Sequence, residues 1–203
     1  MKKIVIFVLL CFLSFSLTAC GQKQESKGSS QYEIGDIVLS DGSVVKGEDI
    51  TAIDDSNIPV AIIAGFREAG GAFGIGVHRS DSPLQWKTED SNTPDNSPAC
   101  HFVNTYAEKY KLTGVFASDW YMPSIEELRD IYQNREALNT SLRKIYALDN
   151  NAAMDGLGTN WYWSSSESDS EDDYVWFVHF LNGYAGECPK NFTNVHVLAA
   201  RTI

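Results

Sequence analysis

The chain contains four histidines, a residue type that often acts as a metal ligand or a general base. They are His78, His101, His179 and His196. Their positions show no HxxxH or HxH spacing, so the sequence does not predict a zinc site. The hydroxyls of Ser164–Ser166 lack the G-x-S-x-G context of an activated serine. We interpret these serines as a strand edge that follows the aromatic segment Trp161–Trp163.

An acidic run is the second candidate for chemistry. It comprises Glu167, Asp169, Glu171, Asp172 and Asp173. Carboxylate oxygens suit Ca²⁺, but the run lacks the EF-hand pattern, and a solvated charge run is the favoured interpretation. Calcium binding by this loop stays open, and we predict no metal site and no cofactor.

Four cysteines supply the thiols of the chain. Cys11 lies in an N-terminal apolar segment and Cys20 follows that segment, which leaves Cys100 and Cys188 for the rest of the chain. Two cysteines of an exported protein can pair. A sequence does not give the distance between them, so a disulfide and two free thiols both remain open.

The N-terminal segment has the order of an export signal. Two lysines precede the apolar residues 4–17, a stretch too short to span a bilayer comfortably. Leu17-Thr18-Ala19-Cys20 resembles a bacterial lipobox, which implies a signal peptide of residues 1–19 and acylation of Cys20. Gly21 in place of Asp implies transport to the outer membrane. We expect a lipid-anchored, cell-surface lipoprotein; an ordinary signal peptide with a stray cysteine is the alternative.

Composition separates a tether from a domain. Residues 20–31 are polar and lack apolar periodicity, which predicts a lipidated flexible tether. Residues 32–203 are enough for one domain with its own core. The chain has 16 basic and 27 acidic residues, and loss of the two signal lysines leaves 14 against 27, a net charge of −13. This acidity argues against nucleic acid and anionic lipid as partners, so the acyl group must hold the protein to the membrane.

Strands are predicted at the start of this domain. Residues 35–47 contain two β-rich runs around Asp41-Gly42, which predicts a hairpin. Residues 59–66 form a continuous apolar run typical of a buried strand, and residues 72–80 predict another. Residues 81–99 predict a loop fixed by Trp86.

Three helices are predicted in the middle of the chain, over residues 99–112, 122–138 and 140–148. In the second, Ser124 and Glu127 have the spacing of a capping box. From Trp161 onward the apolar period changes to two. Strands, then helices, then strands, without βαβ alternation, predict an α+β fold.

The C-terminal segment 160–203 has one regular face and one irregular face. Alternate apolar residues of two predicted strands are expected to face the core. They are Trp176, Val178, Phe180, Val195, Val197 and Ala199. Between them stand outward residues with no pattern of size or polarity, namely His179, Leu181, Asn194, His196, Leu198 and Ala200. The link 182–194 is predicted to be a loop.

Motifs in this region resemble those of a known family. "DWYMPSIEELRDIY", "YWSSSE", "VWFVHFLNG" and "VHVLAAR" are similar to motifs of bacterial C-type lectin-like domains of the formylglycine-generating-enzyme subtype. Within that group the chain resembles the variable proteins of diversity-generating retroelements, the Treponema variable protein-like lipoproteins. Tyr121 replaces the usual Arg, and Val175 replaces the usual Ala. The resemblance implies an α+β C-type lectin-like fold of antiparallel strands with two or three helices.

The resemblance also implies a function. In such systems errors at template adenines rewrite the 3′ end of the gene, so outward residues vary and bind ligands, a protein or a glycan at the cell surface. The implied variable residues are Tyr174, Val175, His179, Leu181, Tyr184, Ala185, Cys188, Pro189, Asn191, Phe192, Thr193, Asn194, His196 and Leu198. Glu187 and Lys190 fall outside the permitted set of residue types and must be constant.

Two alternatives remain. Irregular outward residues are also typical of an ordinary solvated face, so an invariant adhesin or envelope lipoprotein of the same fold is possible. The enzyme for which the fold is named oxidises a substrate cysteine, which makes an oxidase that uses Cys100 or Cys188 a further alternative. Its active-site cysteines lie close together in sequence, whereas these two are far apart, and a fold does not carry activity with it. We predict that the protein is not an enzyme.

Overall fold

The computed structural model describes residues 31–87 and 97–203. The predicted signal peptide 1–19, the lipidation site Cys20 and the tether up to residue 30 therefore lie outside the described residues. Contacts group Gln31–Ile203 into one unit. Within the described ranges, no helix has the length and apolar character needed to cross a membrane.

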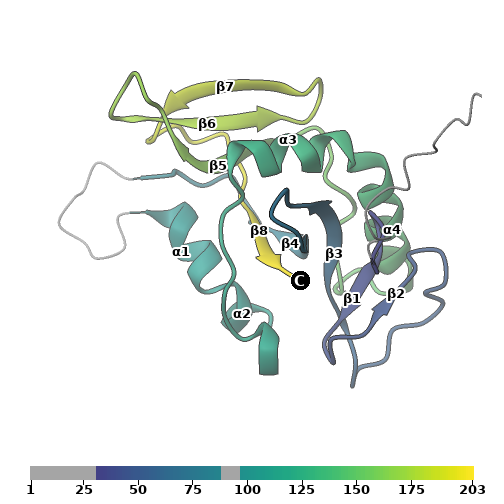
Figure 1. The fold of residues 1–203 in the computed structure, drawn as a ribbon. Coiled ribbons are helices and arrows are strands. Elements are labelled where there is room, and N and C mark those ends of the chain that lie inside the picture. The colour runs from purple at the N-terminus through teal and green to yellow at the C-terminus, as the bar shows by residue number, and fades with distance from the viewer. Residues whose placement is uncertain (1–30, 88–96) are drawn as a thin grey trace, which may run out of the picture. The chain divides into compact units, whose positions relative to one another are not determined.

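A five-stranded antiparallel sheet forms one layer of this unit, in the order β2-β1-β3-β4-β8 (Figure 1). Its strands are β1 (Ile37–Leu39), β2 (Val44–Val45), β3 (Pro59–Phe66), β4 (Ala72–Arg79) and β8 (Leu198–Thr202). The predicted hairpin is confirmed, because Ile37 pairs with Val45. Seven of the eight residues of β3 are buried, as its apolar run predicts.

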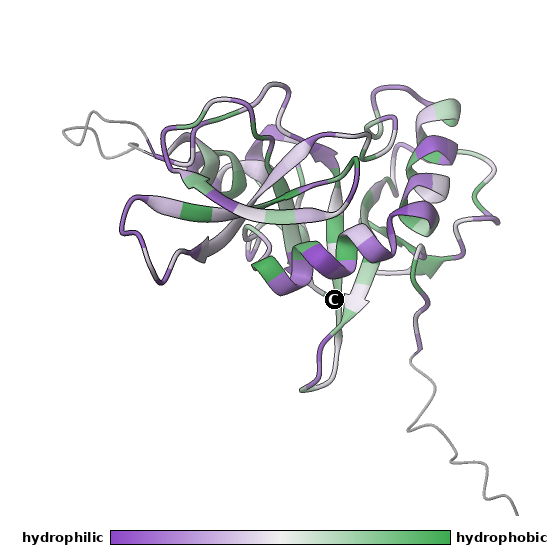
Figure 2. Ribbon diagram, turned by 90° about the horizontal axis from the view of Figure 1, so that it is seen from above, coloured by the Kyte–Doolittle hydropathy of each residue, from purple (hydrophilic) through white to green (hydrophobic). Residues whose placement is uncertain are grey.

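Helices cover the sheet. They are α1 (Pro98–Asn104), α2 (Tyr106–Lys109), the 3₁₀ turn η1 (Gly114–Phe116), α3 (Ile125–Gln133) and α4 (Arg135–Leu148). The predicted capping box at Ser124 is present in full. The prediction of one helix over 122–138 is wrong at its end, because α3 ends at Gln133. The side-chain amide of the capping residue Asn134 donates to the carbonyl of Ala64 in β3 at 3.0 Å. Hydrophilic and hydrophobic residues alternate along α3 and α4, as amphipathic helices require (Figure 2).

A second, three-stranded sheet lies across α3 from the first (Figure 1). It consists of β5 (Trp161–Glu167), β6 (Tyr174–His179) and β7 (Tyr184–Pro189). The prediction that 182–194 is all loop is therefore wrong for its first half. Residues 184–189 pair with β6 along their whole length, from His179–Tyr184 to Tyr174–Pro189. Gly183 makes the tight turn between them with φ +74°.

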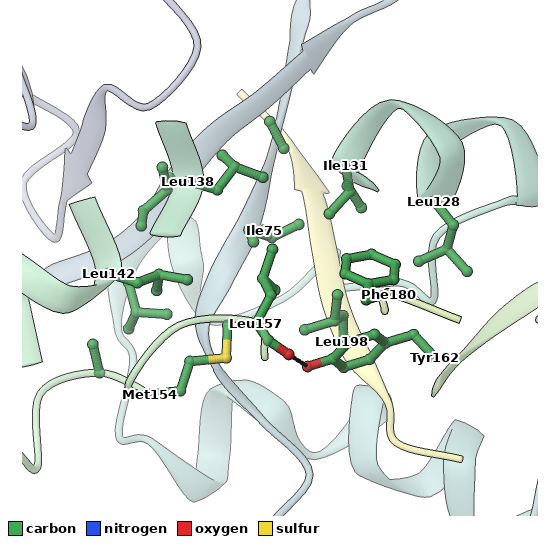
Figure 3. Close-up of a cluster of buried hydrophobic side chains, with 14 of the residues drawn as sticks. Ile75, Leu128, Ile131, Leu138, Leu142, Met154, Leu157, Tyr162, Phe180 and Leu198 are labelled. Carbon is green, nitrogen blue, oxygen red and sulfur yellow. Dashed lines mark hydrogen bonds between the residues drawn. The ribbon is translucent and has the colours of Figure 1, made fainter. Parts of the chain in front are cut away.

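The core joins both sheets through α3. Figure 3 shows Leu128 and Ile131 of α3, Ile75 of β4 and Leu198 of β8 around Phe180 and Tyr162. The hydroxyl of the buried Tyr162 donates to the carbonyl of Leu157 at 2.7 Å, which satisfies its polar end. A second buried cluster lies on the opposite faces of both sheets. The mixed α+β architecture with antiparallel sheets confirms the predicted C-type lectin-like fold.

Candidate ligand-binding surface

The regular residues of the C-terminal segment do face the core. Val178 and Phe180 lie on the side of the three-stranded sheet that packs against α3, and Trp176 is partly buried beside them. Val195, Val197 and Ala199 belong to the second buried cluster. The sequence therefore identified the inward positions correctly.

The other face of the three-stranded sheet carries an aromatic cluster, which consists of Trp161, Phe177, His179, Tyr184 and Phe192. The rings of Trp161 and Phe177 stack with centroids 4.6 Å apart and planes 5° from parallel. His179 lies 5.0 Å and Phe192 5.8 Å from the ring of Trp161. Tyr184 lies 6.0 Å from Phe177. Residues from β5, β6, β7 and the following loop thus meet at one place.

The cluster has a buried base and exposed outer rings. Phe177 is buried, whereas Tyr184 is 59% and Phe192 36% exposed. The ring of Tyr184 lies against Gly186, where a Cβ atom would stand only 2.7 Å from the ring. A glycine at 186 therefore lets the tyrosine lie flat along its own strand. Together these rings form an aromatic surface that packs on the buried Phe177 and faces solvent.

Polar residues continue this surface beyond β7. Asn191, Thr193 and Asn194 are exposed beside Phe192. The loop is fixed at both ends, because the Phe192 amide donates to the Pro189 carbonyl at 2.9 Å and the buried Val195 accepts from the Leu84 amide at 2.9 Å. The exposed side chains therefore project from a constrained backbone.

Three predicted contact residues and one further outward residue are buried instead. They are Val175, Cys188, Leu198 and Ala200. The prediction that they face outward is wrong, because the sheet has a core on each face. The second buried cluster covers Val175 and Cys188, and Leu198 pairs with Arg79 and packs into the α3 core. Alternation along one strand cannot reveal that a distant segment covers its other face.

The remaining predicted residues fall into two groups. Leu181 is 63% exposed in the β6–β7 turn. Tyr174 and Pro189 form the last pair at the opposite end of the sheet from Tyr184, and Ala185 packs against the α3 core. None of these three shares a ring contact with the aromatic cluster among the described residues.

The side chain of His196 lies outside the aromatic cluster, whereas its backbone amide donates to the carbonyl of Trp161 at 2.8 Å. Its Nδ1 is 3.1 Å from the carbonyl oxygen and 3.3 Å from the hydroxyl of Ser80, and burial lowers its pKa. The buried Ser80 hydroxyl also accepts from the Val197 amide at 3.1 Å. The contacts of Ser80 with His196 and Val197 therefore hold two backbone segments together. Because the Ser80 hydroxyl is buried, it cannot act as a nucleophile. Sequence reasoning missed this contact because 116 positions separate its members.

Glu187 and Lys190, expected to be constant, contact the acidic loop. The Lys190 ammonium donates to Glu167 Oε2 at 2.6 Å and to the Asp172 carbonyl at 2.7 Å. Glu187 accepts from the Ser168 hydroxyl at 3.0 Å. The described residues contain no group of three or more His, Cys, Asp or Glu arranged to hold a metal. The ammonium of Lys190 thus provides a positive charge in direct contact with the acidic loop.

The two cysteines of the described domain are unpaired. Cys100 is partly buried and Cys188 is buried, and both are free thiols. Burial raises the pKa of the Cys188 thiol to about 12. A thiol with so high a pKa is protonated at neutral pH and reacts poorly, since the thiolate is the nucleophile.

Tyr121, which departs from the family motif, joins a polar network. Its hydroxyl donates to Glu127 Oε1 at 2.9 Å, and Arg67, which directly follows β3, donates to the same oxygen at 2.9 Å. Arg67 also donates to the Tyr121 hydroxyl. The guanidinium that the motif would supply at 121 thus comes from Arg67, in the turn between β3 and β4.

Comparison with known families agrees with this architecture. The sequence profile of the Lcl C-terminal domain matches residues 77–201, more than half of the 203-residue chain. The match extends from β4 to β8, so it includes α3 and all three strands beneath the aromatic cluster. No curated protein matches the chain. The chain therefore belongs to the Lcl C-terminal domain family, a variable-protein-like family with a lectin-like fold.

Proposed function

We propose that this protein is a lipid-anchored lipoprotein of the outer membrane that presents the aromatic cluster and residues 191–194 to a protein or glycan ligand outside the cell. The observation that supports this most is the stacked pair of Trp161 and Phe177 beneath the exposed rings of Tyr184 and Phe192. Tyrosine and other aromatic residues give a large contact area at low entropic cost, and Asn and Thr beside them provide adaptable hydrogen bonds.

The surface is also suited to variation. Substitution of a buried aromatic residue such as Phe177 costs roughly 3–5 kcal/mol, whereas most exposed positions change stability by about 0.5 kcal/mol or less. The exposed residues Tyr184, Asn191 and Asn194 can therefore be rewritten while the sheet keeps its fold. This is the physical requirement for a diversified ligand-binding face.

Sequencing the 3′ end of the gene across isolates tests the diversification. We expect substitutions at adenine-containing codons to concentrate at Leu181, Tyr184 and residues 191–194. Val175, Leu198 and Lys190 should stay constant, because each is buried. Equal variation at the buried and exposed positions would contradict the proposed mechanism.

An invariant adhesin of the same fold predicts a different combination of results. Its 3′ end would be constant across isolates, yet ligand binding would still depend on the aromatic cluster. Arrays of extracellular-matrix proteins and of glycans provide the readout. We expect Tyr184→Ala with Phe192→Ala to abolish capture, and Phe66→Ala with Val115→Ala, two exposed apolar residues outside the cluster, to leave it unchanged. Capture that survives the first pair excludes this surface as the binding site.

The oxidase alternative has less support. Cys188 is buried with a raised pKa, so it is a poor nucleophile. Replacement of Cys100 and Cys188 by Ser should leave ligand capture intact, which separates binding from thiol chemistry. We therefore propose a binding protein that is not an enzyme.

A further inference from the structure

A cavity of about 200 Å³ lies between the β3–β4 pair and the end of α2, and it shares no residue with the aromatic cluster. Its apolar wall comes from Ile58, Val60 and Leu112, among others. An engineered apolar cavity of about 150 Å³ is large enough to bind benzene. The space therefore suits a small organic molecule with a compact apolar body.

One side of the cavity is aromatic. The imidazole of His78 stacks on the ring of Tyr110 with centroids 4.1 Å apart and planes 10° from parallel. The buried Tyr106 packs against Tyr110 at 4.8 Å, and its hydroxyl accepts from the His78 amide at 3.1 Å. Within residues 31–87 and 97–203 the imidazole nitrogens of His78 have no hydrogen-bond partner. The imidazole of His78 and the ring of Tyr110 thus line one side of the cavity.

Two carboxylates line the cavity, and the ammonium of the nearby Lys109 is paired with Asp81 at 2.6 Å. The carboxylates are those of Asp55 and Asp149, and no Lys or Arg lines the cavity among the described residues. The Asp149 carboxylate accepts from the neutral Asn151, through its backbone amide at 2.9 Å and its side-chain amide at 3.3 Å. Two exposed carboxylates are too few to hold a metal ion, whereas carboxylates beside aromatic rings attract an organic cation.

We infer that this cavity binds a small organic cation, a primary amine whose apolar body of about benzene's size fills the space beside Val60 and Leu112 while its ammonium meets Asp55 and Asp149. A carboxylate ligand would instead place its negative charge beside the negative charges of the two aspartates, which would repel it. A neutral alcohol would fill the space without the ion pairs. Affinity should therefore follow the order amine, alcohol, carboxylate.

Calorimetric titration of the detergent-solubilised full chain with benzylamine, benzyl alcohol and benzoate tests the inference. Benzylamine should bind about fivefold more tightly than benzyl alcohol, and benzoate least tightly. Ala152→Phe fills the cavity and should abolish saturable binding. Any heat that remains with this variant measures the partition of the ligand into detergent. Equal affinity for benzylamine and benzoate would overturn the assignment.

Variants that remove charge without changing side-chain volume test the ion pairs separately from the packing of the cavity. Asp55→Asn with Asp149→Asn should reduce benzylamine affinity to that of benzyl alcohol. Asp169→Asn with Asp173→Asn removes the same charge from the exposed acidic loop and should change nothing. If both pairs lower the affinity equally, the cavity does not select the cation. Tyr184→Ala leaves benzylamine binding unchanged, so this result stands apart from the proposed surface function.

Discussion

At the scale of single residues, Lys190 is a buried structural residue that lies next to exposed residues of the proposed contact surface. It lies within the predicted variable segment, yet its side chain is buried, with the ammonium on Glu167 and 5.2 Å from the ring of Trp86. A buried charge requires partners, and loss of one is costly. The side chain thus has a structural reason to stay constant while Asn191 and Phe192 beside it are exposed.

His78 gives a prediction for the dependence of stability on pH. Burial, with the nearby Lys109, lowers its pKa from 6.5 to about 4, although Asp81 acts in the opposite direction. Between these values the unfolded chain binds more protons than the folded one, so stability rises with pH through this window and is lost as pH falls. The difference between 6.5 and about 4 corresponds to roughly 3 kcal/mol.

The test replaces His78 by Phe, which keeps a ring for Tyr110 to stack on but cannot titrate. Urea unfolding of both proteins at pH 7 and pH 4 gives the measurement. We expect the free energy of unfolding of the variant to fall less on acidification. The carboxylates Asp55, Asp81 and Asp149 and the ammonium of Lys109 remain in both proteins. Identical losses in the two proteins would show that His78 is not buried as a neutral imidazole.

At the scale of elements, α3 joins the two sheets, since it contacts β3 on one side and β5 and β6 on the other. Its start depends on Ser124, whose hydroxyl accepts from the Glu127 amide at 3.2 Å while Glu127 accepts from the Ser124 amide at 3.0 Å. Ser124→Ala should reduce the free energy of unfolding by about 1 kcal/mol in urea titration. Ser165→Ala, on the exposed side of β5, is the matched control. A loss no larger than that of the control would contradict a capping role.

Local sequence sufficed for some elements and failed for others. The capping box and the apolar run of β3 depend on neighbours in sequence, and both were predicted correctly. The strand β7 contains Gly, Pro and Cys, and it forms because β6 supplies a full set of backbone partners. The burial of Val175 has the same kind of cause, because chain segments far away in sequence cover it. Non-local contacts therefore decided which predicted contact residues face solvent.

At the scale of the whole molecule, residues 31–203 form their own unit, so their fold should not depend on the proposed lipid anchor at Cys20. Cys20→Ser should abolish labelling by palmitate and release the protein from the membrane fraction. The circular dichroism and the melting temperature of the variant should match those of the unsubstituted protein. Retention in the membrane fraction without label would contradict anchoring through Cys20.

The position of β8 has a consequence for the diversification proposed above. The strand closes the five-stranded sheet against β4, with Ala200 opposite Ile75, and it follows the exposed residues 191–194 in the chain. A frameshift or stop codon introduced upstream deletes this edge and uncovers the backbone and apolar side chains of β4. If the 3′ end of the gene is diversified as proposed, a copy that ends before β8 would lose the closed sheet together with the binding surface.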